Sequence, residues 1–287
     1  KKDGYEIEAV QNRGYRIVGT PDILSENELS SIRKTDWIGK KIYYYDETDS
    51  TNVRASRLAE EGAEHGTLVV ADQQDAGKGR RGRGWSSLPG TGIFMTLILK
   101  PELNPSNASM LTLVAAMAVA KGITRCTGME AKIKWPNDIV YQGKKLCGIL
   151  TEMSADMDQI HYVIVGIGIN VQMTDFPKEI QNTATSLKLV TGKTLLRNEL
   201  LAKVLEEFEV LYEFVEKLPH ILKPGGRVAI LTFHSGEDRI VKKAFKEMKN
   251  SGVYEDVCRN VIRPTKEECH RNSRAKSTKM RWAIKAK

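Results

Sequence analysis

Long hydrophobic runs and paired cysteines are both missing from this sequence of 287 residues. A membrane span needs roughly 20 apolar residues, and the best run here, residues 110–120, stops at Lys121. No secretory signal pattern opens the chain. The four cysteines show neither CxxC pairing nor zinc-ligand spacing, which favours reduced thiols over a disulfide framework or a zinc site. We therefore expect a cytoplasmic globular protein that does not enter a membrane.

The formal charge of +8 is unevenly distributed along the chain. Residues 217–287 contain 18 Lys and Arg against 7 Asp and Glu, whereas residues 1–216 contain 26 against 29. Basicity is therefore a property of the C-terminal part, and the chain looks composite. A basic tail suits a polyanion, so RNA binding or RNA modification is one class of function to consider.

Residues 74–85, QDAGKGRRGRGW, form the most distinctive stretch of the sequence. Four glycines interleave four cations and a tryptophan closes the run: Gly77, Lys78, Gly79, Arg80, Arg81, Gly82, Arg83, Gly84 and Trp85. Apolar β-like runs at 67–73 and 92–99 flank it, so a stiff sheet is expected to present a loop that stays mobile until an anion orders it. Such a loop suits a nucleoside triphosphate or an activated carboxylate, although a solvated basic hairpin tip is the alternative.

Hydrophobic patterning elsewhere predicts a mixture of strands and helices. The expected strands are one that starts at residue 42, the runs 67–73, 92–99 and 161–171, and three strands within 131–153 joined by WPND and QGKK turns; the expected helices are 53–62, 105–128 and 197–217. The helix over 105–128 is apolar almost all round and is therefore expected in the core.

Small polar residues stand where the first of these helices begins. Ser50, Thr51 and Asn52 would meet free backbone N–H groups there, an arrangement that can hold a carboxylate or a ureido group. The alternative is a simple helix cap, with Asp49 or Ser50 as the capping residue.

Polar residues also interrupt the strands of 131–171. A Trp135–Pro136 corner would aim Asn137 and Asp138 in a fixed direction. Lys145 precedes an apolar strand, and a lysine entering a buried strand is costly unless it meets an anion.

Two glycines, Gly166 and Gly168, lie inside the apolar strand expected over 161–171. Glycine in a strand interior often marks a place where another group approaches the backbone closely. No helix follows this GxG directly, so a dinucleotide-binding site is not expected.

Residues 46 to about 216 resemble the biotin–protein ligases, which biotinylate the carrier subunit of biotin-dependent carboxylases. The matching motifs occur in the family's order: DSTN (49–52), QDAGKGRRGRGW (74–85), KWPND (134–138), KKLCGIL (144–150) and GIGIN (166–170). The resemblance implies an α+β fold over residues 32–216, with a mixed sheet flanked by helices like that of class II aminoacyl-tRNA synthetases.

The segments before and after this region resemble parts of other domains. Residues 1–18 look like the wing hairpin of the family's winged-helix domain, so 1–31 is expected to be a remnant and linker; the recognition helices are missing, and DNA binding is not expected. Residues 217–287 resemble the C-terminal end of the small-subunit rRNA N4-cytosine methyltransferases, through 225–242 and 272–283, in place of the usual SH3-like domain. The tail departs from that pattern at Gly236 and Ser273, and the half that binds S-adenosylmethionine is absent.

The resemblance to the ligases implies a reaction in two steps. ATP and biotin give biotinoyl-5′-AMP and pyrophosphate, and a lysine of a biotin carboxyl carrier protein then takes the biotinoyl group. The residues implied for catalysis are Lys78, Arg80 and Lys145. Those implied for biotin are Ser50, Thr51, Asn52, Gln74, Gly77, Lys78, Arg80, Lys145, Gly148, Gly166 and Gly168. Those implied for ATP are Arg80, Arg81, Arg83, Trp85 (beside the adenine), Asn137, Asp138 and Asn170, with Asp138 also a ligand of Mg²⁺.

Three alternatives remain open at this point. A lipoate ligase of the same fold would run the same adenylation on another acid. A protein that acts on RNA would use the basic tail, for which we expect at most weak RNA affinity. A repressor would need DNA-binding helices. A homodimer is left open, and the tail is expected to pack imperfectly, with an exposed strand edge.

Overall fold

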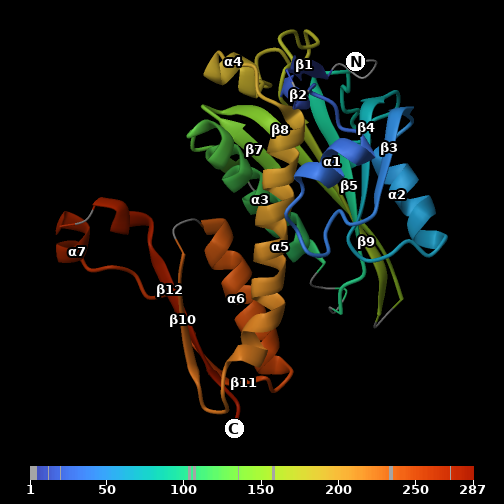
Figure 1. Ribbon diagram of the computed structural model, residues 1–287. Coiled ribbons are helices and arrows are strands. Elements are labelled where there is room, and N and C mark those ends of the chain that lie inside the picture. The colour runs from blue at the N-terminus through green and yellow to red at the C-terminus, as the bar shows by residue number, and fades with distance from the viewer. Residues whose placement is uncertain are drawn as a thin grey trace.

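The computed structural model of the protein describes residues 5–11, 13–19, 21–102, 105, 108–134, 136–156, 159–232, 235–271 and 273–287. Trp135, predicted to fix the corner before Asn137, lies outside this set. The described residues form an N-terminal hairpin, a central mixed sheet and a small C-terminal sheet (Figure 1).

The central sheet has the strand order β3–β4–β5–β9–β8–β7–β6. β3 (Ile42–Thr48) runs parallel to β4 (Thr67–Gln74), and the other neighbouring strands are antiparallel. The remaining strands are β5 (Gly92–Leu99), β6 (Lys132–Lys134), β7 (Asp138–Tyr141), β8 (Lys144–Ala155) and β9 (Ile160–Asn170). The strands predicted from apolar runs are confirmed, and so is the predicted α+β class.

Helices cover both faces of this sheet. α3 (Ser109–Thr127) and α5 (Arg197–Ile221) contribute to the core on one face, and α2 (Thr51–Glu60) contributes to the core on the other. Leu68 belongs to the first core and its neighbour Val69 to the second. Because alternate residues of a strand point to opposite faces, burial on both sides produces uninterrupted apolar runs. Two short helices, α1 (Glu26–Ile32) and α4 (Leu187–Thr191), complete this part.

The predicted core helix is α3. Its stretch Met110–Thr127 is long and apolar enough to cross a membrane, but 61% of it is buried inside the protein, as in a core helix. The helix ends at Gly128, whose φ of 72° is left-handed and favours glycine.

The N-terminal hairpin pairs β1 (Glu6–Val10) with β2 (Gly14–Gly19), as predicted. Most of its residues are exposed. Tyr5 donates a hydrogen bond to the carboxylate of Glu28 in α1, which attaches the hairpin to the main body.

The tail has a small core of its own. It contains β10 (Arg227–Thr232), α6 (Ser235–Asn250), β11 (Tyr254–Val257), α7 (Lys266–Arg271) and β12 (Lys279–Lys285), with the sheet order β10–β12–β11. The sequence pattern does not predict β11, because acidic residues occupy half of YEDV. Within the described residues β10 and β11 are the edge strands of this sheet, and the imperfect packing expected of the tail stays a prediction.

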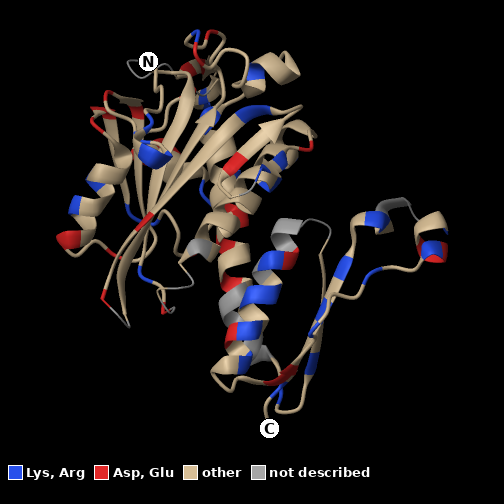
Figure 2. Ribbon diagram, turned by 180° about the vertical axis from the view of Figure 1, so that it is seen from behind, with Lys and Arg blue, Asp and Glu red and all other residues tan. Residues whose placement is uncertain are grey.

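The tail is joined to the main body by two helices (Figures 1 and 2). α5 continues to Ile221, so the domain boundary predicted at residue 217 falls inside a helix. α6 packs against α3, and Ala244 belongs to the main core. On its other side Asp238 accepts two hydrogen bonds from the buried Arg281 of β12, at 2.7 and 3.1 Å. α6 is therefore held from both sides.

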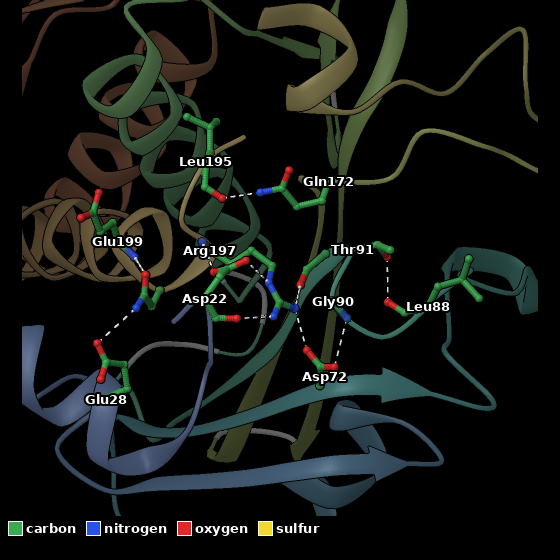
Figure 3. A network of polar contacts seen from close by, with 12 residues as sticks. Asp22, Glu28, Asp72, Leu88, Gly90, Thr91, Gln172, Leu195, Arg197 and Glu199 are labelled. Carbon is green, nitrogen blue, oxygen red and sulfur yellow. Dashed lines mark hydrogen bonds and ion pairs between the residues drawn. The ribbon is translucent and has the colours of Figure 1, made fainter. Parts of the chain in front are cut away.

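Arg197, at the first turn of α5, connects three segments that are far apart in sequence (Figure 3). Its guanidinium donates to Asp22 (2.8 Å), to Asp72 of β4 (2.6 Å) and to the carbonyl of Gly92 in β5 (3.2 Å). The residue is only 3% exposed. It therefore fixes the linker and α5 to the end of the sheet where β4 leads into the glycine-rich loop.

Replacing Arg197 with Met is expected to lower the free energy of unfolding by about 3 kcal/mol, because two largely buried carboxylates lose their partner. Chemical denaturation of the two proteins would measure this. As a control, Arg16→Met removes an ion pair with Glu8 whose side chains are more than half exposed, and should cost less than about 1 kcal/mol. Equal losses for the two variants would contradict the anchoring role of Arg197.

Candidate functional site

The glycine-rich loop folds back on itself above the sheet. Gly79 N–H donates to Arg83 O at 2.7 Å, and Trp85 N–H donates to Gly77 O at 2.8 Å. Arg81 takes a left-handed φ of 58° at the tip of the loop. These bonds bring the two ends of the loop together, so that Lys78 and Trp85 enter the same space.

That space is a pocket formed by the loop, the start of α2 and strands β8 and β9. Its lining consists of Ser50, Thr51, Asn52, Gln74, Lys78, Gly79, Trp85, Phe94, Asn137, Lys145, Gly148, Ile149, Leu150, Gly166, Ile167 and Gly168. Nine of the eleven residues implied for biotin are among them; Gly77 and Arg80 are not. Of the residues implied for ATP, only Trp85 and Asn137 line it.

The floor of the pocket is backbone, because glycines face it. A Cβ on Gly168 would lie 2.6 Å from the Trp85 ring, and one on Gly148 would lie 2.7 Å from it. The Trp85 ring therefore lies against these glycines, among the residues implied for biotin, whereas the resemblance implies a place for it beside the adenine. Its Nε1 is buried and has no hydrogen-bond partner among the described residues.

The free volume of the pocket is about 40 Å³. Ligand pockets usually measure roughly 300 Å³ or more. The Trp85 ring fills the space over the glycines, so a bicyclic ligand must displace this ring or the loop that carries it.

A buried network of hydrogen bonds organises the α2 side of the pocket. Gln74 Oε1 accepts from the Thr51 backbone N–H at 2.8 Å. Thr96 Oγ1 donates to Asn52 Oδ1 at 2.7 Å and lies 2.9 Å from Thr51 Oγ1. Asn52 Nδ2 donates in turn to Glu152 at 2.6 Å. Sequence reasoning missed Thr96, and its one signal was a lone polar residue in the apolar run 92–99.

The structure does not support the alternative that Ser50 serves as a simple helix cap. Ser50 occupies the N-cap position, but within the described residues its side chain makes no capping hydrogen bond. Asp49 Oδ1 instead accepts from the Ser50 N–H at 2.8 Å. Ser50 lines the pocket.

Lys145 meets an anion, as predicted for a lysine that enters a buried strand. Its Nζ lies 2.7 Å from Asp138 Oδ1 and 5.2 Å from the centre of the Trp85 ring. Its backbone N–H donates to Thr183 O at 2.7 Å, which fixes the start of β8. Burial raises the pKa of the nearby Cys147 thiol far above its ordinary value, so that cysteine is not a nucleophile.

The remaining cations and polar residues lie around this centre. Arg80 Nη1 donates to Asn137 Oδ1 at 3.0 Å, outside the pocket itself. Asn170 is buried and donates to Thr185 O at 3.1 Å, so its amide holds the loop after β9. Arg81 and Arg83 are exposed on the loop and do not line the pocket.

The described residues contain no group of three or more His, Cys, Asp or Glu that could hold a metal ion. Asp138 offers a single carboxylate, already paired with Lys145. Magnesium commonly binds through one or two carboxylates together with substrate phosphates, and one carboxylate fits that role only when a nucleotide is present.

Two protein families match this chain, over different segments. The Biotin/lipoate A/B protein ligase family matches residues 44–170, and the MraW methylase family matches residues 199–286. All the residues that line the pocket described above lie within the first match. The predicted fusion of a ligase with a methyltransferase fragment is confirmed.

Individual relatives agree with this division. "Bifunctional ligase/repressor BirA" of Bacillus subtilis (strain 168) is 46% identical over 214 residues, 74% of this chain and 66% of that protein. The chain thus spans slightly less than two thirds of this relative. "Ribosomal RNA small subunit methyltransferase H 1" of Agathobacter rectalis is 66% identical over 80 residues, 28% of this chain and 23% of that protein.

Among solved structures, the biotin protein ligase from Aquifex aeolicus in complex with biotin and ATP superposes with a TM-score of 0.54 at 37% identity. The match covers 67% of this chain and 83% of that one. About two thirds of this chain therefore shares the fold of that biotin protein ligase.

Proposed function

This chain belongs, through residues 44–170, to the biotin/lipoate A/B protein ligase family, and from that premise we propose that it is an ATP-dependent biotin–protein ligase. It would adenylate biotin to biotinoyl-5′-AMP and pass the biotinoyl group to the acceptor lysine of a biotin carboxyl carrier protein. The observation that carries the proposal is the pocket in which Lys78 and Lys145 approach a floor of glycines under the cationic loop.

In the first step two anions must meet, so cations are needed where they react. A carboxylate oxygen of biotin attacks the α-phosphorus of ATP, the bond to the β-phosphate oxygen breaks, and pyrophosphate leaves with the electron pair. Lys145 lies at the end of the pocket, where it can exchange its contact with Asp138 for the two reactants. Lys78 and Arg80 supply further positive charge from the loop.

The acid itself would be held at the other end of the pocket. Ser50, Thr51 and Gln74 present hydroxyl and amide groups of the kind that bind a ureido ring, and the flat bicycle would replace the Trp85 ring against the glycine floor. The mixed anhydride is hydrolysed by water, so a loop that closes over it also protects it. Magnesium would be held by Asp138 and by phosphate oxygens, where it would reduce the charge of the polyphosphate.

The proposal is tested by pyrophosphate release from the purified chain with Mg-ATP and one acid at a time. We expect release with biotin and none with lipoate or without an acid. Release with lipoate alone would instead make the chain a lipoate ligase, and no release with either would remove the proposed function.

We do not propose methylation for the tail, because its match covers only 23% of the methyltransferase. We place the ligase reaction in the cytoplasm, which agrees with four unpaired cysteines. Dimer formation stays a prediction that the proposed reaction does not require.

A further inference from the structure

A second cavity, of about 520 Å³, lies beside the pocket on the side of α6. It opens beyond the start of β7, where Asp138 pairs with Gly148, so that residues 150–153 of β8 form part of its wall, and α3 supplies an apolar wall. Asn137, Ile149 and Leu150 line both cavities, so the two spaces adjoin.

The charged residues of this cavity come from two parts of the chain. Arg80 reaches it from the glycine-rich loop, and Arg239 and Lys243 reach it from α6 of the tail. Glu152 is the one carboxylate in the lining, and its Oε2 accepts from Asn52 at 2.6 Å. The lining has three cations and one carboxylate, and Glu247 of α6 lies near Lys243, so an excess of positive charge remains beside a wall of low polarity.

We propose that Arg239 and Lys243 bind the β- and γ-phosphates of the nucleotide and, after adenylation, the pyrophosphate. This inference rests on the proposed function, since the reacting α-phosphate must lie between Lys145 and Arg80. Arg80 bonds to Asn137 at 3.0 Å, and Asn137 stands between the two cavities. A polyphosphate that starts at the pocket and passes Asn137 therefore enters the space between the loop and α6.

Contacts on both sides of α6 hold Arg239 and Lys243 in place beside the cavity. Ala244 lies in the main core, and Asp238 is bound to the buried Arg281. Blue bands along α6 in Figure 2 mark its Lys and Arg residues, and among the described residues of this helix only Arg239 and Lys243 line the cavity. A tail that resembles a methyltransferase fragment would thus complete a ligase site.

The test compares two double variants of the full chain. Arg239→Gln with Lys243→Gln removes the cavity cations, and Lys242→Gln with Lys246→Gln removes two exposed cations of the same helix. We titrate each protein with inorganic pyrophosphate and with biotin by calorimetry, and measure the KM for Mg-ATP by biotin-dependent pyrophosphate release. The cavity variant should bind pyrophosphate and Mg-ATP about 100-fold more weakly, roughly tenfold for each charged contact, with unchanged affinity for biotin. The surface variant should match the parent.

A charge-retaining variant, Arg239→Lys with Lys243→Arg, should recover most of the affinity for pyrophosphate, which loss of folding would not allow. Parent-like pyrophosphate binding and KM in the Gln variant would overturn the inference. So would a variant that adenylates biotin normally but transfers it slowly to the carrier protein, because the cavity would then serve the acceptor. If the parent protein binds added pyrophosphate but produces no pyrophosphate from Mg-ATP and biotin, the proposed ligase function is wrong, whereas the phosphate-binding site remains supported.

Discussion

Replacing Lys145 with Ala is expected to slow the formation of biotinoyl-AMP by on the order of 100-fold or more, the usual cost of losing a preorganised charged contact at a reacting centre. The ammonium group lies 2.7 Å from Asp138 in the structure, and its strand is fixed by the backbone bond to Thr183. Without it, Asp138 would face the incoming polyphosphate as an uncompensated negative charge. Single-turnover formation of biotinoyl-AMP from Mg-ATP and biotin measures the effect.

Two further variants separate the charge from the general effect of a mutation in this hairpin. Lys144→Ala changes the neighbouring exposed lysine and should leave the rate unchanged. Lys145→Arg keeps the charge but displaces it, so its rate should fall between those of the parent and Lys145→Ala. A Lys145→Ala protein that forms biotinoyl-AMP at the parent rate would show that another group performs this role.

The parts of the fold that could be predicted are those whose residues are buried in a regular pattern. β4, β5 and β9 lie between two layers of helices, and their two-sided burial leaves apolar runs that periodicity alone identifies. β11 carries two acids in four residues and takes its place only because β12 pairs with it. Such a strand depends on tertiary pairing, which no local pattern contains.

The residues of the candidate site likewise fall into those that the local sequence predicts and those that depend on tertiary contacts. The motif glycines and Lys145 can be recognised from the local sequence, because glycine and a charged lysine are both unfavourable inside a buried strand. Thr96 was missed because its role depends on Thr51 and Asn52, more than 40 residues away. The position of α6 beside the second cavity depends on packing between segments that resemble different families, and neither resemblance predicts that contact.

Gly166→Ala is expected to have the second large effect, because the new methyl group has no room. A Cβ at this position would overlap the Asn52 side-chain oxygen and lie 2.8 Å from Asn52 Cγ. That side chain cannot move freely, since Thr96 and Glu152 both bind it. Overpacking and the loss of buried hydrogen bonds together should reduce stability by about 3 kcal/mol. We expect biotin affinity to fall by about 100-fold, as measured by calorimetry, because the same network shapes the pocket.

A double-mutant cycle distinguishes this clash from a general intolerance of β9 to alanine. If the methyl group acts through Asn52, then Asn52→Ala removes its obstacle, and Gly166→Ala should cost far less in that background than in the parent. The backbone itself is no obstacle, since Gly166 is not among the glycines with positive φ. Fully additive losses of stability would mean that Asn52 and Gly166 do not interact in this way. The glycine would then be required for the contact between the ligand and the strand, and the affinity for biotin would fall in Gly166→Ala whichever residue occupied position 52.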